Sequence, residues 1–277
     1  MKRIIFIIIL FYCLNLSAQP IDSLHISHNF SIGVGYMQMM SSGWLPFGLP
    51  AVNLSTDYQY FKMDRKHNNN YWGYWLKSQF AFLQIDVPNK FSIYQKYYLS
   101  KYYRTEIKTG GVWLRKIPIK SDKFRLFIGA GVSLNTEFNF TRYHGALYYN
   151  FPDLNWFLSP DLHIRAEYNF KKIILKGEIL LPIVQIGNYL DKYGYLPVNP
   201  DVCSILKYKF TPNTFVFLNK IFQPNITISA KIPLNENNQK QWFFLIKYAF
   251  ESLDVNLKNF TEKKEQHDLR IGFICEM

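Results

Sequence analysis

Hydrophobic and polar residues alternate along most of this chain, so that every second position is apolar over long stretches. In the segment 158–170, Leu162 and Ile164 are apolar, while His163 and Arg165 occupy the alternate positions. Successive side chains of a β-strand point to opposite faces, so this alternation predicts a strand with one apolar and one polar face. The pattern predicts about ten strands, over 28–40, 50–62, 72–86, 104–118, 123–137, 157–170, 171–186, 222–234, 240–256 and 266–277.

The predicted strands are long, because they run for about ten to fourteen residues whereas strands of globular proteins have about five or six. A tilted strand needs about ten residues to cross a bilayer. The connections between the strands also alternate in length. Short turns are expected at 66–70, 119–122, 169–171 and 235–239, and long loops at 41–49, 87–103, 138–156, 187–221 and 257–265. Short turns at one end and long loops at the other are typical of a membrane barrel.

The first residues have the layout of a secretory signal peptide, with a basic start at Lys2 and Arg3, an apolar run and small residues before Gln19. We therefore expect residues 1–18 to be removed and residues 19–277 to form a single domain. No second apolar run of helix length follows, although 48% of the residues are hydrophobic and 18% are aromatic. An exported chain of this composition can cross a membrane only as a closed barrel.

These features make the chain similar to the bacterial outer-membrane β-barrel class. The resemblance is one of architecture, covers residues 19–277 and indicates no particular family. It implies an all-β, antiparallel, up-and-down transmembrane barrel in the outer membrane of a Gram-negative bacterium, placed there by the barrel insertion machinery. Short turns would face the periplasm and long loops the cell exterior. Barrels of this class usually end on an aromatic residue, whereas this chain continues from Phe273 to Met277.

Periodicity alone does not tell which face of the barrel points outward. A soluble, lipocalin-like barrel would show the same alternation with its apolar side chains turned inward. Charged residues in the middle of strands, such as Arg165 and Glu178, would be costly in a dry core. Aromatic residues also gather near strand ends, as at Trp72 and Trp242. Together with strand length, these features favour the membrane orientation.

A cluster of charged residues shares the polar face that would line the lumen. The predicted lumen network consists of Arg125, Asp161, His163, Arg165, Glu167, Lys176 and Glu178. Opposite charges on neighbouring strands fill a narrow barrel stably, so we interpret this network as structural. A catalytic alternative stays open, in which His163 beside Asp161 acts as a base and Ser133 as a nucleophile. No GxSxG motif supports it.

Lysine and tyrosine residues interleave in the second long loop. Its candidate lipid-headgroup ligands are Lys90, Lys96, Lys101 and Arg104. Cations can pair with lipid phosphates while tyrosines lie at the interface, which predicts contact with lipopolysaccharide. An ordinary solvated loop above an aromatic girdle is the open alternative.

Other ligand classes find little support in the sequence. The formal net charge is +12, but no nucleic-acid-binding module is visible, so no nucleic-acid partner is predicted. Beyond the leader only Cys203 and Cys275 remain, and without a Cys/His cluster we predict neither a metal site nor a cofactor.

Three functional classes follow from this sequence. We favour a non-enzymatic outer-membrane barrel whose long aromatic and basic loops bind a ligand, a surface partner or lipopolysaccharide. The alternatives are a lipid hydrolase or protease with its site at the outer rim, and a narrow, porin-like passive channel. A ten-strand barrel lined with long side chains favours a filled lumen, which places the channel below the binding protein.

Overall fold

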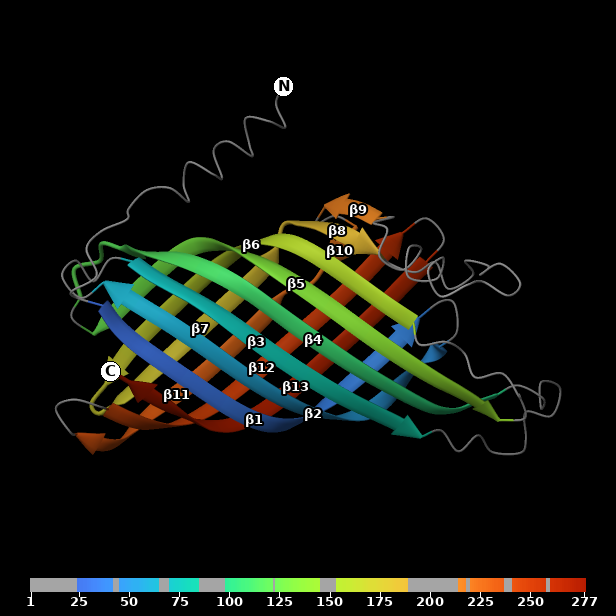
Figure 1. Ribbon diagram of the computed structural model, residues 1–277, viewed down its shortest axis with the longest axis horizontal. Helices are drawn as coiled ribbons and strands as arrows, with labels where there is room; N and C mark the ends of the chain where they lie inside the picture. The colour runs from blue at the N-terminus through green and yellow to red at the C-terminus, as the bar shows by residue number, and fades with distance from the viewer. Residues whose placement is uncertain are drawn as a thin grey trace, which may run out of the picture.

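The structure is a computed structural model, and it describes residues 24–41, 45–64, 70–84, 98–121, 123–144, 153–188, 214–217, 220–236, 241–257 and 260–277. These residues form one continuous β-sheet (Figure 1). Its strands are β1 (Leu24–Ser41), β2 (Leu45–Asp64), β3 (Asn70–Gln84), β4 (Tyr98–Ile117), β5 (Phe124–His144), β6 (Asp153–Phe170), β7 (Ile173–Pro182), β8 (Val184–Asn188), β9 (Thr214–Phe217), β10 (Ile221–Phe222), β11 (Asn225–Glu236), β12 (Gln241–Leu257) and β13 (Phe260–Glu276).

The sheet closes on itself as an antiparallel barrel. Strands β1 to β7 pair in chain order, each with its neighbour. Strand β7 then pairs with β11, β11 with β12, β12 with β13, and β13 with β1. These pairings make a closed ring of ten main strands, which run at a slant around the barrel (Figure 1). The prediction of an all-β, up-and-down barrel with about ten strands is thus confirmed.

Two of the predicted strands are interrupted by proline. The strand predicted over 171–186 is β7 followed by β8, which turns from β11 to pair with β9. The strand predicted over 222–234 is β10 followed by β11. The ladder between β7 and β11 ends at Leu180 and Asn225, next to Pro182 and Pro224. Proline has no N–H to donate, which accounts for the end of the ladder at this level.

The structure contradicts two of the predicted long loops. Residues 42–44 alone separate β1 from β2, and residues 258–259 alone separate β12 from β13. Between the other strands at this end, the connections 85–97, 145–152 and 189–213 lie outside the described residues. We call this the loop end, and we call the opposite end, with the connections 118–123 and 171–172, the short-turn end. Met277 lies at the short-turn end, where its backbone pairs with that of Ile26.

The apolar face of the barrel points outward. On β1 and β13 the outward Ile32 and Ile271 are 50% and 52% exposed, whereas the inward Ser31 and Arg270 are 0% and 1% exposed. A soluble barrel would show the opposite arrangement, so this alternative is wrong for the described strands. Among the described residues, no helix is long and apolar enough to cross a membrane.

The outward apolar surface forms a belt that stops before the loop end. On β12 it runs from Trp242 to Phe250, and beyond it the outward Asp254 and Asn256 are polar and exposed. At the same level the inward residues become apolar, because Leu253 and Val255 are buried there. The β12–β13 hairpin therefore projects past the belt with an apolar interior, as a soluble sheet would have.

Apolar side chains also pack inside both ends of the barrel. The cluster at the loop end consists of Phe157, Ile221, Leu253 and Val255, with Val216 against it. The clusters at the short-turn end consist of Phe61, Tyr71, Val112, Leu114 and Phe127, and of Phe243, Leu245 and Ile274. Between these clusters the lumen is lined by buried polar and charged groups.

Candidate functional site

The lumen holds a cluster of charges whose partners come from opposite walls. Lys264 on β13 is fully buried and donates to Glu106 on β4 at 2.8 Å and to Glu251 on β12 at 2.9 Å. Lys108 pairs with Glu106 at 2.9 Å and also donates to Glu251. Because β4 is not a sheet neighbour of β12 or β13, the pairs Lys264–Glu106 and Lys108–Glu251 cross the lumen. Nothing in the local sequence pattern marks Lys264 and Glu106 as partners, since they lie 158 positions apart.

Arg104 extends this cluster toward β5. Its guanidinium donates to Glu137 and lies 3.8 Å from Glu106. The prediction that Arg104 belongs to a lipid-binding loop is therefore wrong, because the residue lies within β4 and is 2% exposed. Inward and outward positions alternate along a strand, and Arg104 falls on the inward set. Of its predicted companions, Lys90 and Lys96 lie outside the described residues, as does the side chain of Lys101.

A second cluster joins β2 to β12 and β13. Asp57 accepts from Lys247 and lies 3.4 Å from a guanidinium nitrogen of Arg270. Arg270 also donates to Asp268 at 2.7 Å, and Asp268 accepts from Asn53 at 2.7 Å. Two cations thus face two carboxylates in a compact, buried group. Buried charges need this kind of pairing, since an unpaired one would carry the full cost of lost hydration.

Four members of the predicted lumen network meet around Glu178. Its carboxylate accepts from Arg165 at 2.7 Å, pairs with Lys176 at 2.9 Å and lies 3.7 Å from Nε2 of His163. The guanidinium of Arg165 also lies over the ring of Phe61, 4.1 Å from its centroid. Cross-strand register explains the meeting, because Arg165 of β6 stands opposite Glu178 of β7.

The other three predicted members lie elsewhere. Arg125 and Glu167 are register partners on β5 and β6, and both are half-buried. Asp161 accepts a hydrogen bond from Ser159 at 2.8 Å, and the hydroxyl of Ser159 lies 2.9 Å from that of Ser133.

The catalytic candidates therefore do not form a Ser–His–Asp arrangement. Ser133 reaches Asp161 through Ser159, while His163 faces Glu178. Within the described ranges, His163 forms no hydrogen bond with either serine. A base must lie within hydrogen-bond reach of its nucleophile, and this pair does not meet that condition.

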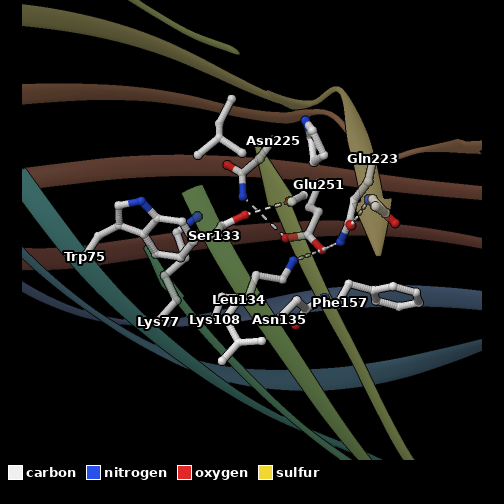
Figure 2. A pocket seen from close by; sticks show the side chains of 14 residues that line it. Trp75, Lys77, Lys108, Ser133, Leu134, Asn135, Phe157, Gln223, Asn225 and Glu251 are labelled. Atoms are coloured by element: carbon white, nitrogen blue, oxygen red, sulfur yellow. Dashed lines mark hydrogen bonds and ion pairs between the residues drawn. The ribbon is translucent and has the colours of Figure 1, made fainter. Parts of the chain in front are cut away.

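A small cavity lies beside Ser133 (Figure 2). Figure 2 shows Ser133, Lys77 and Trp75 on one side of it and Glu251 and Gln223 on the other. The cavity measures about 30 Å³, which is room for a water molecule and not for a lipid or a peptide. In the described ranges, no group of three or more His, Cys, Asp or Glu side chains is placed to hold a metal ion.

Comparison with known proteins finds likeness only at the level of solved structures. No family model matches the chain. No curated protein matches it either. Among solved structures, the outer-membrane protease OmpT from Escherichia coli is similar at 10% identity and a TM-score of 0.46, over 94% of this chain and 100% of that one. The translocator domain of the autotransporter NalP from Neisseria meningitidis is similar at 10% identity and a TM-score of 0.41, over 99% and 96%.

A third similar structure is Ail, the attachment invasion locus protein of Yersinia pestis, at 11% identity and a TM-score of 0.32, over 90% of this chain and 97% of that one. By its closed antiparallel ring of strands and its outward apolar face, the chain is a β-barrel of the bacterial outer-membrane class. At these identities and TM-scores the likeness supports no conclusion about function, so what this barrel does has to be argued from its own residues.

Proposed function

We propose that this protein is a non-enzymatic outer-membrane barrel that binds a ligand at its loop end, either lipopolysaccharide or a surface partner. The filled lumen is the observation that carries the proposal. Among the described residues, charge clusters occupy its middle and apolar clusters occupy both ends, which supports an interior without a passage for a solute or room for a substrate. Binding then falls to the connections 85–97, 145–152 and 189–213, all of which contain several aromatic residues, while 85–97 and 189–213 also contain lysines.

Export is part of this proposal, with residues 1–18 acting as a cleaved signal peptide. Protein purified from an outer-membrane fraction should have the intact mass of a chain that starts at Gln19. A mass that includes residues 1–18, or recovery in the soluble fraction, would contradict export by this route.

The folded barrel is expected to show no steady conductance across a planar bilayer. Ions would have to pass Lys264, Glu106 and Glu251, which pair with one another inside the barrel. Conductance should be recorded only from protein whose gel mobility still shifts on heating, which shows that the barrel is folded. A negative result then does not come from unfolded chains. A steady, reproducible conductance would support the passive channel instead.

Replacement of Lys90, Lys96 and Lys101 by glutamine is expected to lower the amount of lipopolysaccharide that co-purifies with the barrel. A cation near an anionic membrane surface contributes about 1 kcal/mol, or about a fivefold change in binding. The control for removal of a single exposed cation at the same end is Lys263→Gln, because Lys263 lies on the projecting β12–β13 hairpin. Unchanged lipopolysaccharide in the triple variant would leave the surface partner as the ligand.

A further inference from the structure

The short-turn end carries a group of exposed cations beside its two described turns. We call this group the basic rim, and it consists of Arg115, Lys120, Lys123, Lys171 and Lys172. Among the described residues, Arg115, Lys120, Lys123 and Lys171 form no ion pair with a carboxylate. The only acidic residue in the segments 115–124 and 168–173 is Asp122, which lies outside the described residues.

The two turns of the basic rim are joined by a backbone hydrogen bond. Asn169 N–H donates to the carbonyl of Lys123 at 2.8 Å, which links the β4–β5 turn to the β6–β7 turn. The hydroxyl of Ser121 accepts from the N–H groups of Lys123 at 3.3 Å and Phe124 at 3.1 Å. Side-chain acceptors of this kind order a turn. The cations therefore project from a defined edge of the barrel.

The basic rim lies next to aromatic residues that face outward. Trp113 lies two positions before Arg115 on the same face of β4. The centroid of its ring is 6.4 Å from that of Trp72 on β3. Phe170 is 52% exposed, and the ammonium of the next residue, Lys171, lies 5.7 Å from the centre of its ring. Aromatic girdles of outer-membrane barrels mark the depth of the membrane interface. The order along the wall is thus apolar belt, aromatic girdle and cations.

The loop end lacks this excess of exposed cations on its described outward face. There Lys263 lies 4.0 Å from Asp254, and Glu265 follows on the same face of β13. Among the described side chains that face outward beyond the belt, positive charge is therefore mixed with negative charge at the loop end and predominates beside the two described turns of the short-turn end.

From this placement we propose that the basic rim binds the headgroups of anionic phospholipids in the membrane leaflet at the short-turn end. The cations lie just past the aromatic girdle, which is the depth of the lipid phosphates. Lysine and arginine side chains can extend along the wall to reach them. The charge complements an anionic headgroup, and the position beside the girdle favours a lipid over a soluble acidic protein. The contact would add an anchor at the end of the barrel opposite the loops.

The test compares retention of phosphatidylglycerol and phosphatidylcholine by the folded barrel, measured by native mass spectrometry from mixed micelles. The wild-type chain should prefer phosphatidylglycerol. The double variant Lys120→Gln/Lys123→Gln should lose about fivefold of this preference for each cation removed. The control Lys220→Gln/Lys263→Gln removes the same charge from exposed positions at the loop end, and it should keep the preference within about twofold.

Three results would overturn the proposal. The first is an unchanged preference in the basic-rim variant, and the second is an equal loss in the control, which would indicate net charge alone. The third is capture of a soluble acidic protein by the basic rim without any lipid preference. The heat-dependent gel shift checks that each variant is folded. Raising the salt to about 0.5 M should weaken the lipid preference of the wild-type chain, because exposed charges are screened.

Discussion

Lys264→Met is expected to lower the free energy of unfolding by about 3–5 kcal/mol, the usual cost of breaking a buried ion pair by removing one partner. The substitution would remove the ammonium of Lys264, which lies 2.8 Å from a carboxylate oxygen of Glu106 and 2.9 Å from one of Glu251. These carboxylates belong to a cluster in which Arg104, Lys108 and Lys264 balance Glu106, Glu137 and Glu251. Unfolding in urea, followed by the heat-dependent gel shift, measures the loss.

The adjacent residue supplies a matched control. Lys263 points outward on the same strand, and its side chain is 62% exposed. Lys263→Met is therefore expected to change the free energy of unfolding by less than about 0.5 kcal/mol. Equal effects at the two positions would show that the buried cluster does not stabilise the barrel. The double variant Glu251→Gln/Lys264→Met should recover part of the loss, because it also removes the uncompensated carboxylate.

Ile271→Arg is expected to lower the stability of the barrel in a bilayer by about 2–4 kcal/mol, the cost of a cation on the lipid-facing side near the midplane. Ile271 lies in the middle of the apolar belt, opposite Ile32 of β1 and Ile246 of β12. All three side chains are at least 40% exposed, so a soluble barrel would tolerate arginine at this position with little change. The measurement is denaturant-dependent folding into phospholipid vesicles.

Glu265→Arg is the control for the belt. Glu265 faces outward on the same strand but lies beyond the apolar belt, where arginine stays in water. This variant should fold into vesicles as well as the wild-type chain does. If Ile271→Arg and Glu265→Arg behaved alike, the outward apolar face would not be in contact with lipid, and the membrane orientation would have to be abandoned.

The projecting hairpin shows where interpretation of the sequence failed. Residues 257–265 were expected to form a long loop, yet β12 and β13 continue through them except for 258–259. Inside the belt, apolar residues point outward, but past Phe250 the outward residues are polar and Leu253 and Val255 point inward. The alternation persists with its faces exchanged. From the sequence alone, this exchange of faces cannot be distinguished from the end of a strand. The reason is that the sequence does not show at which residue the strand leaves the membrane.

The sequence by itself determined the strand content, the alternation of faces and the outer-membrane barrel class, because strand periodicity and strand length are local properties of the chain. It also placed Arg165, Lys176 and Glu178 together, since they lie on adjacent strands joined by a short turn. Only the tertiary structure decided that Lys264 meets Glu106 across the lumen and that Arg104 points inward to Glu137. Such contacts depend on the register and closure of the whole barrel, which bring together residues far apart in the sequence.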